Sequence, residues 1–273
     1  MEISLRCPAK VNLGLFIKGK RPDGYHELET IFLKVPTLYD DLTVQLSSKP
    51  GFQIAVALEL PFVDSANSVH LTHNNIMGRV FDGLKYWNST GYPGVYVILT
   101  KRIPMGAGLG GGSSNAFSMF LALKKLYKIE DTPDFRMFEQ SFLASLGADV
   151  PAFRLSDGVF ATGTGIVLQP IKLTIPGEII VFPQPVHSNT KTAYQNLDLT
   201  TCNSDRSLLE LIKLPFSQWQ NNLTNDFEPS VFRQFPSLQF AKNKLLSDGF
   251  DYVSMSGSGS ALFAIKTESR QQQ

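Results

Sequence analysis

The strongest chemical signal in this sequence is a glycine-rich stretch, PMGAGLGGGSSNA, which runs from Pro104 to Ala116. Five of the residues between positions 106 and 112 are glycines, and Ser113 and Ser114 follow them. Glycine permits positive φ angles and close backbone approach, so successive N–H groups can converge on one bound group. A helix beginning at the serines would add partial positive charge and a side-chain cap. The stretch therefore predicts an anion cradle, with a triphosphate as its occupant, rather than a flexible hinge.

Two other kinds of phosphate-binding loop have comparable glycines. Gly106, Gly108 and Gly111 satisfy the G-x-G-x-x-G pattern of dinucleotide-binding folds, so that alternative stays open. The pattern also requires an acidic residue at the end of a second strand about 20 residues on. Glu130 and Asp131 are near that distance, but a helical segment precedes them and leaves no room for a strand. A Walker loop does not fit, because no Gly-Lys-Ser or Gly-Lys-Thr follows the glycines.

The segments on either side of the glycines predict the elements that position them. VYVILT, at residues 95–100, has the β-branched and aromatic composition of a strand. Beyond the glycines, apolar residues recur at helical spacing from Ala116 to Tyr127, with lysines toward the end. The cradle is therefore expected between a strand and a helix, with Ser113 or Ser114 as the cap of that helix.

The rest of the chain mixes strands and helices without an internal repeat. Its first 60 residues read as short strands separated by glycine, proline and aspartate, and a helix is expected from Ser68 to about Asn88. DFRMFEQSFLASL predicts another helix, which ends at Gly147. Strand patterns (GVFATG, EIIVFP, DYVSMSG and ALFAIK) then alternate with two helix patterns (SLLELIKL and PSLQFAKNKLL). This order is typical of an α+β protein, with a boundary between two lobes near residues 151–160.

Length, composition and charge limit the classes of protein to consider. The 273 residues suffice for two lobes at roughly 100 to 200 residues per domain, and 43% hydrophobic with 18% charged residues is ordinary for a globular protein. A net charge of +1 does not indicate a nucleic-acid or anionic-membrane binder. Cys7 and Cys202 cannot form a disulfide scaffold, and the N-terminus lacks a signal peptide's apolar core. We expect a cytoplasmic protein that binds no nucleic acid and no membrane, and no protein partner is implied.

Three stretches spread over nearly the whole chain resemble the GHMP small-molecule kinases. PMGAGLGGGSS is similar to the ATP loop of that family, and CPAKVNLGL from Cys7 and SMSGSGSALFA from Ser254 fit the family as well. The resemblance implies a two-lobed fold, with an N-terminal ATP-binding lobe at residues 1–154 and a C-terminal α/β-sandwich lobe at residues 155–273. It implies ATP as co-substrate and Mg²⁺, whose ligands stay unknown. The ATP-binding residues would be Asn67, Pro104, Met105, Gly106, Ala107, Gly108, Leu109, Gly110, Gly111, Gly112, Ser113 and Ser114.

A fourth stretch narrows the expected substrate. KVNLGLFIKGKRPDGYHELET, from Lys10 to Thr30, resembles one branch of the family. That branch phosphorylates the 2-hydroxyl of 4-diphosphocytidyl-2-C-methyl-D-erythritol in the non-mevalonate (methylerythritol phosphate) route to isoprenoid precursors. RPDGYH, at 21–26, is its most specific part, since the mevalonate and homoserine kinases lack it. GADVPAF at 147–153, NTKTAYQNLD at 189–198 and NDFEP at 225–229 also fit. A GHMP kinase with another substrate, and a sensor that binds ligand without turnover, remain alternatives.

Phosphoryl transfer to an alcohol needs a proton acceptor, a cation and a cradle for the polyphosphate. The resemblance implies that Asp149 is the base and Lys10 the cation. Without it, a lysine on a strand and an aspartate before Val-Pro would read as a solvated residue and a turn residue. The resemblance places two tyrosine rings on the faces of the cytosine and a histidine backbone at its edge. The implied substrate-binding residues are Asn12, Tyr25, His26, Thr190, Tyr194, Gly257 and Ser258.

Overall fold

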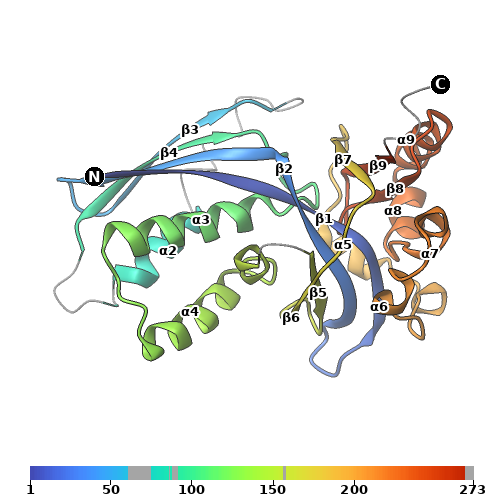
Figure 1. Ribbon diagram of the computed structural model, residues 1–273, viewed down its shortest axis with the longest axis horizontal. Helices are drawn as coiled ribbons and strands as arrows, with labels where there is room; N and C mark the ends of the chain where they lie inside the picture. Colours follow the sequence, from blue (N-terminus) through green and yellow to red (C-terminus); the bar gives the residue numbers. More distant parts are fainter. Residues whose placement is uncertain (61–74, 86, 88–91, 156–157, 268–273) are drawn as a thin grey trace. The chain divides into compact units, whose positions relative to one another are not determined.

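The computed structural model describes residues 1–60, 75–85, 87, 92–155 and 158–267 of a chain that forms two compact units (Figure 1). The first unit comprises Met1–Ala9, Pro36–Met105 and Gly110–Arg154, and the second comprises Lys10–Val35, Gly106–Leu109 and Leu155–Gln273. The units are discontinuous because two long strands, β1 (Glu2–Lys20) and β2 (His26–Ser47), contribute to both. The division of the sequence into domains at residue 154 stays a prediction.

The first unit is a sheet with helices on one face (Figure 1). Its elements beside β1 and β2 are β3 (Phe52–Leu58), α2 (Ile76–Lys85), β4 (Gly94–Lys101), α3 (Gly111–Leu126), α4 (Pro133–Leu146) and the 3-10 helix η2 (Pro151–Arg154). β3 is parallel to β4, which is antiparallel to the later part of β2. Val95, Val97 and Leu99 of β4 are buried, whereas Tyr96 and Ile98 between them are exposed. This alternation is typical of a sheet covered on one face, and here the core lies between the strands and the helices α2, α3 and α4.

The second unit contains a separate three-stranded sheet in the order β7-β9-β8. It also contains β5, which pairs antiparallel with the early part of β2 and with β6. Its strands are β5 (Gly158–Thr162), β6 (Val167–Ile171), β7 (Gly177–Phe182), β8 (Tyr252–Met255) and β9 (Leu262–Thr267). Its helices are α5 (Thr190–Gln195), η3 (Leu199–Thr201), α6 (Leu208–Leu211), η4 (Phe216–Gln218), α7 (Trp219–Asn222), α8 (Glu228–Gln234) and α9 (Pro236–Ser247). Within the described residues, every helix is too short or too polar to span a membrane.

The predicted α+β fold is confirmed, and the element boundaries need two corrections. The short strands expected before residue 50 are two long strands, with Pro8 and Gly14 lying inside β1, whereas the short strand β3 agrees with the prediction. Hydrogen bonds from other segments carry a strand through residues that would end it in isolation. The SLLELIKL helix is only the single turn α6, which is followed by tighter turns up to Leu214, and Pro215 has no N–H to continue the helical bonding to Leu211. The helix α2 (Ile76–Lys85) is part of the helix expected to begin at Ser68. Ser68 itself lies outside the described residues.

Candidate active site

The glycine stretch lies between a strand, β4, and a helix, α3, as predicted, and α3 begins at Gly111 in the first unit. The N-cap is Gly110, with a φ of 68° and a ψ of 16°, and no side chain caps this helix. The prediction that Ser113 or Ser114 is the cap is therefore wrong. The left-handed conformation of Gly110 favours glycine, and it lets the helix start three residues earlier than the serines require. An uncapped helix leaves N–H groups of its first turn available to an anion.

Two buried polar atoms close to this helix start lack hydrogen-bond partners in the part of the chain that the structure describes. Ser114 is 1% exposed, and neither its Oγ nor the Oδ1 of Asn115 has a hydrogen-bond partner among the described residues. A buried polar atom without a partner costs about 1–3 kcal/mol. Beside them Gly112 is exposed, and a Cβ built on it would meet no atom within 4 Å. The start of α3 is therefore open to a bound molecule and carries a hydroxyl that such a molecule could satisfy.

A buried ion pair holds the strand end that precedes the glycines. The Asp40 carboxylate pairs with Lys101, and its Oδ1 accepts hydrogen bonds from the backbone N–H of Arg102 at 2.7 Å and of Ile103 at 2.8 Å. The Ile103 side chain lies against Gly111, where an added Cβ would be only 2.9 Å from its Cγ2. Asp40 thereby fixes the backbone on which the first helical turn of α3 rests.

In the second unit, Lys10 lies against the middle of the glycine stretch. Its backbone N–H donates to the Leu109 carbonyl at 2.9 Å. The side chain is buried, with Nζ donating to Oδ1 of Asn12 at 2.7 Å and lying 5.0 Å from the centre of the Phe32 ring. The side chains of Ala107 and Leu109 are also buried, which leaves backbone and glycines as the exposed part of this segment. The backbone of the residue expected to supply the cation is thus hydrogen-bonded directly to the expected cradle.

A chain of hydrogen bonds fixes the orientation of the Asn12 amide. Nδ2 of Asn12 donates to Thr30 Oγ1 at 2.9 Å, and Thr30 Oγ1 in turn donates to the Gly14 carbonyl at 2.7 Å. Asn12 is 2% exposed and Thr30 is 1% exposed. Because the amide nitrogen is engaged by Thr30, the amide oxygen faces Lys10 and holds its ammonium group.

The turn after β8 packs against the same residues. Ser256 Oγ donates to the Gly108 carbonyl at 2.9 Å and accepts from the Asn12 N–H at 3.3 Å. A Cβ on Gly108 would lie 1.9 Å from the Ser256 carbonyl oxygen, so this approach requires glycine. A Cβ on Gly257 would lie 3.4 Å from both Asn12 Oδ1 and Gly108 Cα. The structure therefore brings Asn12 and Gly257, two expected substrate residues, together with Lys10 and the glycines.

Two further expected substrate residues also meet. The hydroxyl oxygens of Thr190, at the start of α5, and Ser258 are 2.8 Å apart. Asn189 caps α5 by accepting from the Thr192 N–H at 3.2 Å, which fixes the backbone at Thr190. The pair offers two hydroxyl groups to one ligand.

The expected cytosine-stacking rings have different environments. Tyr25 follows a turn whose Gly24 has a φ of 87°, and its side chain is 67% exposed. Tyr194 stacks on the His26 ring, with centroids 5.0 Å apart and planes at 24°, and meets the Phe227 ring edge-on. Burial and, secondarily, the Lys20 charge lower the pKa of His26, which favours its neutral ring. A cytosine between Tyr25 and Tyr194 stays a prediction.

Asp149 lies in the first unit, partly buried in the turn between α4 and η2. Gly147, the predicted end of α4, accepts there from the Val150 N–H at 3.1 Å. Lys10 belongs to the second unit, so its pairing with Asp149 stays a prediction. Asn67, expected near ATP, lies outside the described residues.

Sequence reasoning missed four residues that shape the site. Ser256 lies inside a quoted motif, but a motif does not say which of its serines faces Gly108. Thr30 is likewise the last residue of a quoted motif that does not reveal its contact with Asn12. Asp40 and His187 lie outside the quoted motifs, and each acts on residues distant in sequence. The His187 ring packs on the glycine stretch, because a Cβ on Gly106 would lie 2.2 Å from its Cε1.

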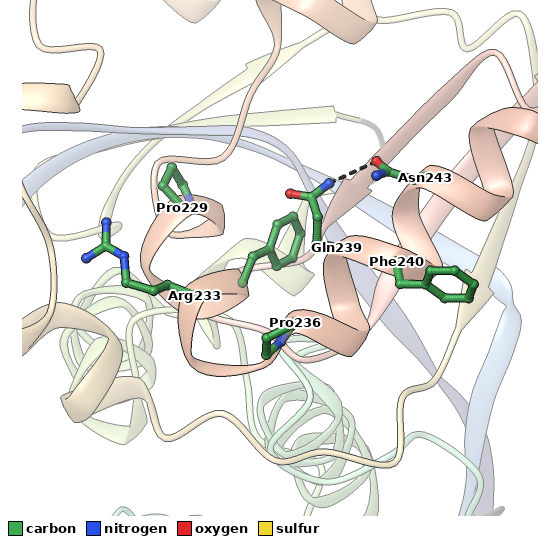
Figure 2. Close-up of a pocket in the computed structure, with 7 residues that line it drawn as sticks. Pro229, Arg233, Pro236, Gln239, Phe240 and Asn243 are labelled. Carbon is green, nitrogen blue, oxygen red and sulfur yellow. Dashed lines mark hydrogen bonds between the residues drawn. The ribbon is translucent and has the colours of Figure 1, made fainter.

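Other features do not contribute to this site. Figure 2 shows a pocket between α8 and α9, and none of the expected site residues lines it. Burial raises the pKa of Cys7 to about 12 and that of Cys202 to about 11, so neither thiol is a ready nucleophile near neutral pH. The described residues contain no group of three or more His, Cys, Asp and Glu side chains arranged to hold a metal ion.

Comparisons with known proteins agree over most of the chain. The models of the GHMP kinases N terminal domain and GHMP kinases C terminal match residues 75–156 and 206–273. The 4-diphosphocytidyl-2-C-methyl-D-erythritol kinase of Chlorobium phaeobacteroides (strain BS1) is 38% identical and covers 98% of this chain and 91% of its own length. The kinase of that name from Bacteroides fragilis (strain YCH46) is 37% identical, with 94% and 89% covered.

Solved structures give the same result. A 4-(cytidine 5'-diphospho)-2C-methyl-D-erythritol kinase matches with a TM-score of 0.77 at 32% identity, covering 96% of this chain and 90% of that one. A homoserine kinase from Cytophaga hutchinsonii matches with a TM-score of 0.64 at 22% identity, covering 97% and 85%, and so shares the fold.

Proposed function

Since this chain belongs to the 4-diphosphocytidyl-2-C-methyl-D-erythritol kinase family of the GHMP kinases, we propose that it transfers the γ-phosphoryl group of ATP to the 2-hydroxyl of 4-diphosphocytidyl-2-C-methyl-D-erythritol. The product would enter the non-mevalonate route to isoprenoid precursors. The observation that carries the proposal is the attachment of Lys10 and Asn12 to the glycine stretch: the Lys10 N–H binds the Leu109 carbonyl directly, and the Asn12 N–H is linked to the Gly108 carbonyl through the Ser256 hydroxyl. RPDGYH at 21–26 favours the cytidine substrate over mevalonate and homoserine.

ATP would be bound mainly by backbone groups. Gly106, Gly108 and Gly110 have positive φ angles between 62° and 78°, which turn the backbone sharply ahead of α3. Ser114 supplies a buried hydroxyl without a partner in the described part of the chain, which a phosphate oxygen or Mg²⁺ could satisfy. Mg²⁺ usually binds through phosphates and waters with few protein ligands, and it would neutralise phosphate charge.

The transfer step would need little covalent chemistry from the protein. The acceptor is a tertiary alcohol, crowded and weakly acidic, so alignment should matter more than prior deprotonation. Asp149 would accept a hydrogen bond from the hydroxyl and take its proton as the new P–O bond forms. Lys10, oriented by the Asn12 oxygen, would hold Asp149 ionised and stabilise the charge on the γ-phosphoryl group in transit, while ADP leaves.

A coupled assay of ADP release tests the function. We expect ATP turnover only when 4-diphosphocytidyl-2-C-methyl-D-erythritol is present, and none with mevalonate, homoserine or water as acceptor. Turnover with another acceptor would identify a different GHMP kinase. Tight binding of ATP and the cytidine substrate without ADP release would identify a sensor.

Replacing Gly112 by valine is expected to weaken ATP binding at least about tenfold, or about 1.4 kcal/mol. The added side chain has open space in the free protein and would occupy it where the phosphates approach the helix start. Calorimetry with a non-hydrolysable ATP analogue measures the effect. Gly110→Val should weaken binding too, but it also strains a left-handed residue, so Gly112 is the cleaner site.

The control for the Gly112 variant is Lys125→Val, at an exposed position of the same helix. It introduces the same β-branched residue away from the glycines and should leave ATP affinity unchanged. An unaltered affinity in folded Gly112→Val would show that the phosphates do not lie at this helix start.

Removing the ring of Tyr25 is expected to raise KM for the cytidine substrate about 5- to 150-fold and leave KM for ATP nearly unchanged, because stacking on a base contributes about 1–3 kcal/mol. The exposed ring contributes little to the fold, so Tyr25→Ala should stay folded. Tyr96→Ala, which removes another exposed tyrosine ring, is the control. Steady-state kinetics with each substrate varied provide the measurement, and equal losses for both substrates would contradict a cytosine contact.

A further inference from the structure

The NDFEP motif has a residue, Asn225, whose buried amide spans two carbonyl groups of the turn after β8. Asn225 is 1% exposed. Its Nδ2 donates to the carbonyl oxygens of Met255 and Gly257, both at 2.8 Å, and its Oδ1 accepts from the Phe227 N–H at 3.0 Å. Both amide protons are therefore used to hold the carbonyl groups of the two residues that flank Ser256.

The backbone around Asn225 is also tied to the strand that carries Lys10. Asn225 forms a parallel bridge with Leu15 of β1. The Leu15 N–H donates to Thr224, and the Asp226 N–H donates to Leu15, each at 2.9 Å. The segment 224–226 thus binds β1 through its backbone, and the Asn225 side chain binds the turn after β8.

The turn after β8 also contacts residues of the candidate site through Ser256. Ser256, held between the two carbonyl groups that Asn225 binds, donates its Oγ hydrogen to Gly108 and accepts from the Asn12 N–H. Asn12 holds the Lys10 ammonium. A second brace acts on the other side of the turn, where Glu228, paired with Lys242, accepts from the Met255 N–H at 2.8 Å.

We infer that Asn225 and Ser256 are positioning residues of the kinase: Asn225 sets the turn so that Ser256 holds Gly108 of the ATP loop and Asn12, the partner of Lys10, in register. This inference rests on the proposed function for its kinetic readout. Neither residue needs to contact a substrate. Their effect would be on the placement of Lys10 and of the phosphate cradle, where an error of about 1 Å can cost on the order of 100-fold in rate.

Asn225→Asp tests the inference, because it keeps the size and the acceptor for Phe227 while replacing both donors with a carboxylate oxygen that repels the two carbonyl groups. We expect kcat to fall about 10- to 100-fold, measured by ADP release at a temperature at which circular dichroism shows the variant fully folded. The affinity for an ATP analogue, measured by calorimetry, should fall as well, since Gly108 loses its support.

Val253→Ala is the control for a merely structural role. Val253 is a fully buried residue of β8, two positions before Met255, and its truncation removes packing without touching the turn. Both variants should have lowered melting temperatures, but only Asn225→Asp should lose kcat while folded. Equal kinetics in the two variants, or a kcat for folded Asn225→Asp within about twofold of wild type, would overturn the inference.

Ser256→Ala decides the matter if Asn225→Asp does not fold. It deletes one hydroxyl and leaves the bonds of Asn225 intact, so it should reproduce the losses in kcat and in ATP affinity. Wild-type values of both in Ser256→Ala would overturn the inference. If the wild-type protein itself releases no ADP, the proposed function fails instead, and the calorimetric arm still tests whether the turn supports the ATP loop.

Discussion

The Asp149→Asn variant is expected to lose about 10²- to 10⁴-fold in kcat while ATP and the cytidine substrate still bind with nearly wild-type affinity. Asparagine keeps the size and one acceptor oxygen of the side chain but cannot take the proton of the attacking hydroxyl. The turn between α4 and η2 is held by backbone bonds such as that from the Val150 N–H to the Gly147 carbonyl, so it should survive the change. Steady-state ADP release gives kcat, and calorimetry gives the two affinities.

Asp134→Asn is the matched control, because Asp134 is an exposed carboxylate in the first turn of α4 and lies in the same unit. It should turn over like the wild type. Near wild-type kcat in Asp149→Asn would remove this carboxylate from the mechanism as a base. A loss of affinity equal to the loss of kcat would instead assign Asp149 to substrate binding.

The Lys10→Met variant is expected to lose kcat over the same range of about 10²- to 10⁴-fold, because methionine keeps the stem of the side chain and removes the cation beside the γ-phosphoryl group. The change also leaves the buried Asn12 oxygen without its donor at 2.7 Å, so a lower melting temperature is expected too. Activity is therefore compared at a temperature where the variant is folded. Lys18→Met, in the same strand and paired with Glu29, is the control for losing a partly buried ammonium group.

The double variant Lys10→Met/Asp149→Asn separates joint from independent action. If the two residues act as one unit, its kcat should be little lower than that of the poorer single variant. Losses that multiply fully would mean that the cation and the base contribute separately. They would also remove the argument that Lys10 keeps Asp149 ionised.

The sequence by itself determined which family the chain belongs to, and it predicts a phosphate cradle at the glycine stretch. Gly106, Gly108 and Gly110 have positive φ angles, which glycine adopts with the least strain, so the expected cradle depends on the local sequence. The helix behind it follows from apolar residues three and four apart, which is also a local property. RPDGYH at 21–26 narrowed the choice of expected substrate for a similar reason. A short contiguous motif can be recognised without knowing how the rest of the chain folds.

The tertiary structure alone decided how the remaining residues meet. The start of α3 at Gly111 could not be read from the serines, because the conformation of Gly110 and the support of Ile103 and Asp40 set it. Ser256 and Asn12 are 244 residues apart in sequence, yet their contact fixes the partner of Lys10. Such pairs depend on how whole strands and turns pack, and local propensity carries no information about them. The expected chemistry of this site can therefore be predicted from its motifs. Its geometry depends on residues such as Asn225, which only the tertiary structure brings close to the site.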